Sequence, residues 1–272
     1  MPKRRTVLQS TCAFTIERVE SLASTHHAGL WSPPYQVATQ RFVLSHSGLT
    51  EFRWGDGQAL LDGISVLCLP MGVPYQMQQV VSVLPAQMDT SNDSTIVISL
   101  PADSGLAVAQ PRVGTVSARM QWQLHRHWRA LARCPHGQPH LPVRNLLDFA
   151  VRALPVLVSE SVAKRIHNVK RDIARRVASL DTPRWTLQDV ADTANLSPFH
   201  LARIFKAHTG LTLHAYRQQL RLAMALQCLQ GGMRNLADLA AGLGYSSQSH
   251  MGFAFQRELG VTPAQARVQL AD

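Results

Sequence analysis

The pattern of hydrophobic and polar positions changes near residue 135. Before that point, short apolar runs alternate with turn-forming residues such as Gly55-Asp56-Gly57 and Ser91-Asn92-Asp93. Runs of this length and spacing predict β-strands gathered in a small sheet or barrel. The runs are 36–44, 49–54, 64–69, 75–83 and 95–100.

A helical period begins after the last of these runs. Between Gly114 and Arg133, apolar residues recur every three or four positions, which predicts an amphipathic helix. The members of this stripe are Val116, Met120, Leu124, Trp128 and Leu131. The proline-rich segment 134–142 ends the helix, because proline lacks a backbone N–H and clashes with the preceding turn. From Arg144 onward almost the whole chain has a helical pattern, interrupted at Leu154-Pro155.

The helical half contains an internal repeat. Residues 187–197 match 236–246, and residues 197–212 match 247–262 after one extra residue in the turn. A repeat of about 26 residues that keeps residue type as well as hydrophobicity indicates a duplicated structural unit. Each copy is expected to fold as a helix, a sharp turn and a second helix.

The signals for that fold are local. Serine, threonine and asparagine cap helices, and glycine or asparagine tolerates the left-handed backbone of a sharp turn. The caps are Thr186, Ser197 and Asn235, the turn residues Asn195 and Gly244, and the residues that end the second helices Gly210 and Gly260. The predicted core positions are Leu187, Val190, Ala191, Leu201, Ile204 and Phe205 in the first copy, and Leu236, Leu239 and Ala240 in the second.

The outward positions of the two second helices are candidate DNA-binding residues. A helix exposed in this way fits the DNA major groove, with its N-terminal residues near the base edges. Arg203 can bond guanine with two hydrogen bonds or hold a phosphate, and Gln248 can read adenine. The outward residues are Phe199, His200, Ala202, Arg203 and Lys206 in the first copy, and Gln248, Ser249, Gly252, Phe253, Gln256 and Arg257 in the second. A helix predicted over 213–229 fixes the separation of the two candidate DNA-binding helices. To enter successive major grooves they must lie about 34 Å apart.

Charge agrees with a polyanionic partner. The 272 residues hold 27 Lys and Arg against 17 Asp and Glu, a formal net charge of +10. This excess favours nucleic acid first and a membrane surface second, with an uninvolved basic surface as the alternative. No apolar run reaches the ~18–20 residues that span a bilayer, and the first residues are too polar for a signal peptide. The four cysteines, Cys12, Cys68, Cys134 and Cys228, lie far apart, which predicts free thiols in the cytoplasm.

A set of motifs extends over about 100 residues of the helical half. They are Leu187-x-x-Val190-Ala191, Ser197-Pro198-x-x-Leu201-x-Arg203-x-Phe205-Lys206, Tyr216-x-x-x-x-Arg221-Leu222, Gly244-Tyr245-x-x-x-Ser249 and Phe255-x-x-x-x-Gly260-Val261-Thr262-Pro263. Residues 165–267 thereby resemble the DNA-binding domain of AraC/XylS-type transcription regulators. The resemblance implies that Phe199, Ala202 and Arg203 face the bases in the first copy, and Ser249 and Phe253 in the second. Phe253 stands where the family usually has arginine, so it contacts a thymine methyl or packs inward.

The N-terminal half resembles, more loosely, the effector-sensing and dimerising barrel of this family. The resemblance implies an α+β chain of two domains: a cupin-like β-barrel followed by dimerisation helices, and an all-α domain with two helix–turn–helix motifs. The expected bounds are 1–140 for the barrel with its helix, 141–163 for a helical linker, and 164–272 for the DNA-binding domain. Within that domain the motifs are expected at about 186–207 and 235–257, joined by a helix at about 213–230. Tyr75 stands where such barrels often place histidine, which argues against metal-dependent chemistry.

Two other groups of residues are open to a second interpretation. His125, His127, Cys134, His136 and His140 could hold zinc, but their spacing matches no standard site, so neither a metal nor a cofactor is expected. His26, His27 and His46 are interpreted as surface residues. The aromatic residues Trp31, Tyr35, Phe42, Phe52, Trp54 and Tyr75 could line a ligand pocket, although core packing is favoured.

The leading prediction is a sequence-specific DNA-binding transcription regulator without enzymatic activity. It is expected to be a homodimeric activator that responds to an unidentified small molecule and contacts RNA polymerase. Two alternatives stay open: a DNA-binding protein whose barrel only dimerises, and an enzyme fused to a DNA-binding module. The enzyme would be an alkyl-transferring repair protein using Cys12, Cys68 or Cys134, and it needs an activated thiolate that no local motif supplies.

Overall fold

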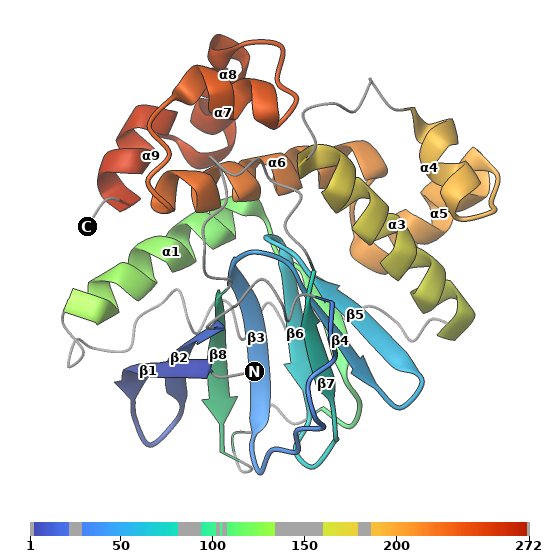
Figure 1. Cartoon of the computed structure of the whole chain (residues 1–272), viewed down its shortest axis with the longest axis vertical. Coiled ribbons are helices and arrows are strands. Elements are labelled where there is room, and N and C mark those ends of the chain that lie inside the picture. Colours follow the sequence, from blue (N-terminus) through green and yellow to red (C-terminus); the bar gives the residue numbers. More distant parts are fainter. Residues whose placement is uncertain are drawn as a thin grey trace. The chain divides into compact units, whose positions relative to one another are not determined.

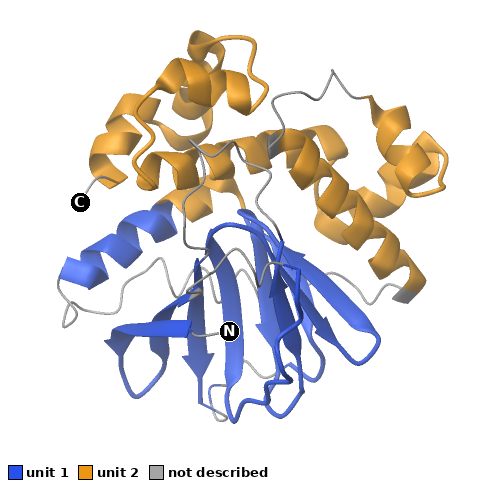
Figure 2. Ribbon diagram, in the orientation of Figure 1, with its two compact units in different colours: residues 1–81, 91–116, 123–154 blue, residues 82–90, 117–122, 155–272 orange. Residues whose placement is uncertain are grey.

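The chain forms two compact units of different secondary structure (Figure 1, Figure 2). The computed structural model describes residues 3–21, 29–80, 94–101, 104, 108–133, 160–178 and 186–270. The sheet unit comprises residues 1–81, 91–116 and 123–154, and the helical unit comprises residues 82–90, 117–122 and 155–272. The predicted change from strands to helices along the chain is confirmed.

The sheet unit is built from two antiparallel sheets. A six-stranded sheet has the order β1-β2-β8-β3-β6-β9, and a three-stranded sheet has the order β5-β4-β7. The strands are β1 (Lys3–Ser10), β2 (Thr15–Ser21), β3 (Gln40–Ser47), β4 (Thr50–Trp54), β5 (Gly57–Leu61), β6 (Ser65–Leu69), β7 (Gln76–Gln79), β8 (Ser94–Leu100) and β9 (Arg112–Thr115). The predicted runs contain β4, β6 and β7 and most of β3 and β8, whereas β1, β2, β5 and β9 were not predicted.

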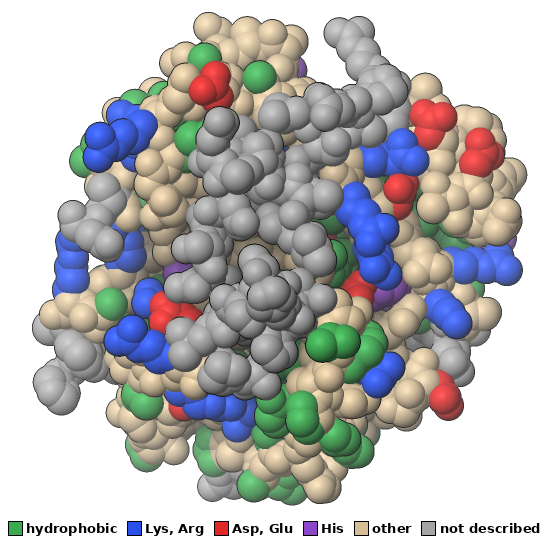
Figure 3. Space-filling model, in the orientation of Figure 1, with side chains coloured by type: hydrophobic (Ala, Val, Ile, Leu, Met, Phe, Trp, Pro, Cys, Tyr) green, Lys and Arg blue, Asp and Glu red, His purple; other side chains and the backbone are tan. Residues whose placement is uncertain are grey.

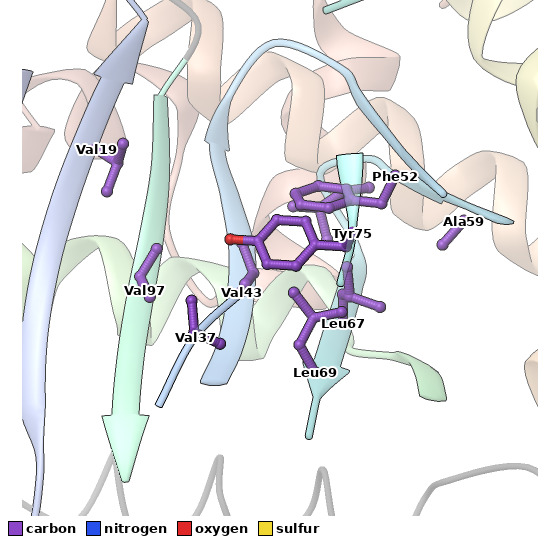
Figure 4. Close-up of a cluster of buried hydrophobic side chains, with 10 residues drawn as sticks. Val19, Val37, Val43, Phe52, Ala59, Leu67, Leu69, Tyr75 and Val97 are labelled. Carbon is purple, nitrogen blue, oxygen red and sulfur yellow. The ribbon is translucent and has the colours of Figure 1, made fainter. Parts of the chain in front are cut away.

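One hydrophobic cluster joins the two sheets (Figure 4). Val43 of β3 pairs with both Leu67 of β6 and Val97 of β8, so these three side chains share one face of the large sheet. Phe52 and Leu61 enter the same cluster from the small sheet. The aromatic residues Phe52 and Tyr75 therefore pack in the core, as favoured from the sequence, with ring centroids 6.0 Å apart.

The other face of the large sheet is also buried, and it corrects the interpretation of His46. His46 lies at a register irregularity of β3 between Ser45 and Ser47, and its side chain is only 5% exposed. Its ring lies 4.9 Å from that of His125, which belongs to helix α1 (Ala118–Arg133). Burial lowers the pKa of His46 well below its usual value, and the charges of His125 and Arg18 act in the same direction. A neutral core histidine replaces the surface residue expected from the sequence.

Helix α1 starts later than predicted, because Gly114 and Thr115 still belong to β9. Leu124, Trp128 and Leu131 of its apolar stripe are buried as expected. Leu154-Pro155 and His26-His27 lie outside the described residues, as do Cys134, His136 and His140 of the proposed zinc cluster. Among the residues that the structure describes, no group of three or more histidine, cysteine or carboxylate side chains is placed to hold a metal.

The helical unit is organised around one long buried helix. Its elements are α3 (Glu160–Ala178), α4 (Leu187–Thr193), α5 (Pro198–Thr209), α6 (Leu213–Gln230), α7 (Leu236–Gly242), α8 (Gln248–Leu259) and α9 (Pro263–Leu270). Helix α6 is buried along Leu220–Leu229 and contacts α3, α5 and α9. The pairs α4–α5 and α7–α8 lie at the two repeat copies and are linked through α6. None of the helices in the described part of the chain is long and apolar enough to cross a membrane.

Candidate nucleic-acid interface

The first helix of each pair begins at the predicted cap. Thr186 forms a capping box with Asp189: the Thr186 backbone N–H donates to Oδ2 of Asp189 over 2.5 Å, and the Asp189 N–H donates to the threonine hydroxyl. The backbone N–H and the hydroxyl of Thr186 both donate to the Asp189 carboxylate, which lowers the pKa of Asp189. Asn235 accepts hydrogen bonds from the backbone N–H groups of Ala237 and Asp238. Both start signals read from the sequence are confirmed.

Both turns need the left-handed backbone conformation. Asn195 has φ +51° and is the non-glycine residue with positive φ in the described chain, and Gly244 has φ +70° at the equivalent position. A Cβ atom at Gly244 would lie 2.6 Å from Nη2 of Arg221, a side chain that is 8% exposed. The guanidinium of Arg221 also lies 5.6 Å from the ring of Tyr245. The second turn therefore requires glycine for its backbone and for the space beside α6.

The second helix of each pair is capped in the same way as its counterpart. Ser197 and Ser247 accept hydrogen bonds from the N–H groups of His200 and His250, over 3.3 Å and 3.1 Å. Pro198 occupies the start of α5, where its missing N–H costs nothing. Helices α5 and α8 both have twelve residues and end at left-handed glycines, Gly210 and Gly260. The two pairs have the same architecture despite differing exposed residues.

The interiors of the two pairs are equivalent as well. The fully buried side chains are Val190, Ala191, Leu201 and Phe205 in the first pair, and Leu239, Ala240, Met251 and Phe255 in the second. Phe205 packs edge-on against Tyr216 of α6 at 5.1 Å, which fixes α5 on that helix. The core assignment of Leu187 is wrong, because this side chain is 40% exposed, and Ile204 and Leu236 are only half-buried. Leu187 is the first residue of α4, where the helix has no preceding turn to cover it.

The candidate DNA-binding residues are accessible in the helical unit. Phe199 is 84% exposed and Phe253 is 64% exposed, so Phe253 does not pack inward. The exposed polar candidates are Arg203, Lys206, Gln248, Ser249, Gln256 and Arg257, whereas His200, Ala202 and Gly252 are half-buried. The two rings do not correspond in the repeat, because Phe199 matches Ser249 and Phe253 matches Arg203. Exposed apolar rings on both α5 and α8 nevertheless make these faces candidate contact surfaces.

A groove lies beside α5 and adds residues that the sequence analysis missed. It has a volume of about 550 Å³. Its lining residues are Leu187, Phe199, Ala202, Arg203, Lys206, Thr212, Leu213, His214 and Arg217. His214 and Arg217 come from the first turns of α6, and burial lowers the pKa of Arg217. The repeat does not reveal these two residues, because they lie outside it, although two basic residues just after the Thr212 cap are a usable signal.

The positive charges differ in how far they are paired. Within the described part of the chain, the side chains of Arg203 and Lys206 make no hydrogen bond or ion pair. Arg257 of α8 instead pairs with Glu258 at 2.8 Å and lies 5.8 Å from the ring of Phe253. Figure 3 shows that basic side chains are spread over the visible face of the molecule. The first pair therefore offers more uncompensated charge than the second.

Comparison with known proteins identifies this arrangement. Residues 190–269 match a family described as a helix-turn-helix domain. An AraC-like transcription regulator of Streptomyces lividans is 36% identical over 111 residues, which are 41% of this chain and 34% of that protein. The C-terminal part of this chain is a helix-turn-helix domain of the AraC type. The AraC-type domain is also similar to the transcriptional activator RhaR of Escherichia coli K12, with 30% identity over 115 residues, 42% of this chain and 38% of RhaR.

Each of these two matches covers about two fifths of this chain. The chain spans about a third of the length of the curated relatives that it matches. Among solved structures, ToxT of Vibrio cholerae covers 96% of this chain and 99% of its own at 12% identity and a TM-score of 0.37. A regulator with an AraC-type domain from Chromobacterium violaceum covers 40% of this chain at 23% identity and a TM-score of 0.37. Both TM-scores are too low to support a common arrangement of the whole chain.

Proposed function

We propose that this protein is a sequence-specific DNA-binding regulator of transcription, and that α5 and α8 are its two reading helices. The observation that carries the proposal is the pair of equally capped helices, each presenting an exposed aromatic side chain and polar neighbours. The helix-turn-helix match over residues 190–269 supports it. In this proposal α4–α5 and α7–α8 are two helix–turn–helix motifs joined by α6, within a DNA-binding domain of residues 164–272.

The roles of individual residues follow from their place on each helix. Residues on the outward face of a reading helix reach base edges, and residues beside that face or near the end of the helix meet the phosphate backbone. The base-facing set is Phe199, Ala202 and Arg203 on α5, and Gln248, Ser249 and Phe253 on α8. The phosphate-facing set is His200, Lys206, Gly252 and Arg257, together with Arg217 from α6. Arg203 is the strongest candidate for reading a specific base, because guanine offers arginine two acceptors in one plane.

The sheet unit is proposed to be a cupin-like barrel that binds an effector and dimerises through the helices that follow it. Two sheets closed over one apolar cluster agree with that fold. The barrel with its helix would span residues 1–140, and 141–163 would link it to the DNA-binding domain. RhaR is an activator by name, which favours activation through RNA polymerase for this chain as well.

Of the three thiols considered for an alkyl-transferring enzyme, Cys68 is disfavoured by its burial, whereas Cys12 is exposed and Cys134 lies outside the described residues. That chemistry needs a thiolate at neutral pH. Burial raises the pKa of Cys68 to about 12, and the nearby charge of Arg112 does not offset it. The pKa of Cys228 in α6 is raised to about 12 for the same reason. Both groups are inert core thiols.

Selection of preferred sites from a random DNA pool by the full-length chain tests the proposal. We expect a short consensus with two parts about one helical turn apart. The matched comparison is Arg203→Ala against Lys164→Ala, because Lys164 is an exposed cation of α3 and belongs to neither reading helix. Arg203→Ala should lose one part of the consensus and Lys164→Ala should keep both. A pool without enrichment, or two variants that behave alike, would refute the assignment of α5 as a reading helix.

A further inference from the structure

The groove beside α5 combines an apolar wall with a group of cations. It has a volume of about 550 Å³, within the range of about 300–1,000 Å³ for pockets that hold small organic molecules. Its lining residues come from α4, α5 and α6, and none of them is a carboxylate. The apolar members are Leu187, Phe199, Ala202 and Leu213, and the cations are Arg203, Lys206 and Arg217.

The internal repeat supplies a comparison for each position of this groove. The offset of 50 residues continues beyond the second helix of each pair, because α6 begins at Leu213 and α9 begins at Pro263. Thr212 and Thr262 stand just before these helices, and the hydroxyl of each accepts from the backbone N–H three residues later over 3.2 Å. The backbone that surrounds the groove is therefore repeated, and the side chains of the two copies can be compared one by one.

The second copy lacks most of the side chains that give the groove its chemistry. Of the three cations, only Arg217 has a basic counterpart, Arg267, whose Nη1 atom donates to the carbonyl oxygen of Arg234 over 2.8 Å. Because the second copy folds without the other side chains, the architecture does not require them in the first. The pairs that differ are Phe199 with Ser249, Arg203 with Phe253, Lys206 with Gln256, and His214 with Ala264.

Both kinds of side chain in the groove are suited to a ligand. Phe199 is 84% exposed and Leu187 is 40% exposed, and apolar surface of this kind beside polar groups is typical of ligand grooves. Arg203 and Lys206 are exposed and three residues apart on α5, so they are neighbours on one face of the helix. Like charges around one groove repel each other, and burial lowers the pKa of Arg217. A bound group with more than one negative charge relieves this repulsion.

We infer that the groove beside α5 binds an organic phosphate with an aromatic or aliphatic body, and that this ligand competes with DNA. The cations of the groove hold the phosphate group, and Leu187 and Phe199 contact the body. Arginine binds a phosphate with two parallel hydrogen bonds, and lysine adds a point charge. The competition rests on the proposed function, because Phe199 and Arg203 belong to its base-facing set. A DNA phosphate also satisfies the cations, but it brings no apolar body to Leu187.

Calorimetric titration of the full-length chain without DNA tests the binding. The probe 1-naphthyl phosphate supplies both parts of the ligand, 1-naphthol supplies the body alone, and inorganic phosphate supplies the anion alone. The aryl phosphate should bind at least about 10-fold more tightly than either part, the effect of one charge-assisted hydrogen bond or more. Absence of aryl phosphate binding, or binding no tighter than that of 1-naphthol or of inorganic phosphate, would overturn the inference.

Two leucines at corresponding positions of the repeat locate the apolar wall. Leu187→Ser should weaken binding of the aryl phosphate by about 3–10-fold, because part of a leucine's apolar contact is lost. Leu236→Ser is the control, because it makes the same change at the first residue of α7, outside the groove. Leu187 belongs to neither DNA-contact set, so Leu187→Ser should select the same DNA sites as the parent chain. Equal ligand binding by the two variants, or loss of DNA selection by Leu187→Ser, would overturn the assignment of this wall to the ligand.

A charge variant and a competition assay complete the test. Lys206→Gln gives the first copy the residue that the second copy has, and it should weaken aryl phosphate binding by about 10–100-fold. Gln256→Ala, the control at the corresponding position of α8, should leave that binding unchanged, and an equal loss in both variants would overturn the site. The aryl phosphate should also displace labelled DNA from the full-length chain, and DNA binding that persists at saturating ligand would overturn the competition.

The outcomes separate this inference from the proposed function. DNA site selection is carried out without ligand, and ligand titration is carried out without DNA. Intact DNA selection with no aryl phosphate binding removes only the present inference. Aryl phosphate binding without DNA selection removes the proposed regulator and, with it, the competition.

Discussion

Replacing Gly244 with alanine should destabilise the α7–α8 pair through two separable effects. The residue has φ +70°, a conformation that costs a residue with a Cβ atom roughly 1–2 kcal/mol. The new Cβ would also lie 2.6 Å from Nη2 of Arg221, which must move away from its buried position. Overpacking of this kind costs about 1–3 kcal/mol. Together the two effects predict a loss of about 2–5 kcal/mol in the free energy of opening this pair.

Hydrogen exchange of the full-length chain measures that free energy locally. The backbone N–H of Tyr245 donates to the Ala240 carbonyl over 2.9 Å, so its exchange reports on whether the turn is closed. A loss of 2 kcal/mol or more raises its exchange rate by about 30-fold or more. Gly252→Ala is the matched control, because a Cβ there meets nothing within 4 Å in the middle of α8. That change should stabilise the helix by about 0.5–1 kcal/mol.

The two effects separate when Arg221→Ala is combined with Gly244→Ala. The double variant is compared with Arg221→Ala alone. Without the arginine the overpacking disappears, so Gly244→Ala should cost only the backbone contribution of about 1–2 kcal/mol in this comparison. Exchange in Gly244→Ala as slow as in Gly252→Ala would refute the requirement for a left-handed turn. An equal cost with and without Arg221 would refute the steric contribution alone.

Three other perturbations test the DNA interface and the core below it. Arg203→Ala should weaken binding to a selected site by about 1–3 kcal/mol and to random DNA by less, as measured by fluorescence anisotropy; equal losses would make Arg203 a phosphate contact. Lys206→Ala should weaken both DNAs alike and reduce the slope of log K against log salt by about one, whereas an unchanged slope argues against a phosphate contact. Burial, helped by the charge of Lys170, lowers the pKa of His208 to about 4 from 6.5, so the unfolded chain binds more protons between these values. Stability against urea should therefore fall as the pH drops from about 6.5 to about 4, and His208→Gln should flatten that fall; the same profile in both proteins would contradict the assignment.

The helical unit could be predicted from the sequence because its signals are short-range. The caps at Thr186 and Ser197 and the turn at Asn195 depend on backbone groups within a few residues. The amino-acid sequence alone therefore indicates where these helices begin and where the chain turns. The duplication then checks each assignment against its counterpart. Residues set by packing at a distance were harder: Leu187 is exposed and Arg217 joins the groove because of where α4 and α6 meet α5.

The sheet unit was predicted less completely for a physical reason. Strand β1 begins Lys3-Arg4-Arg5-Thr6 and is mostly exposed, so it has no apolar run, and its hydrogen bonds come from β2 further along the chain. The burial of His46 was missed because it involves His125 of α1, a residue far along the chain, and because β3 is irregular between Ser45 and Ser47.

The unequal surfaces of the two helix pairs give the molecule a polarity. Among the described residues, Arg203 and Lys206 of α5 have no charged partner. Helix α8 instead carries glutamine, serine and phenylalanine, and its Arg257 is paired with Glu258. A DNA duplex bound across both helix pairs would therefore be contacted differently at its two ends, even by a single protomer. In the proposed function, inverting such a site would exchange the parts of the DNA that the two helix pairs contact, so the orientation of a site as well as its position would matter.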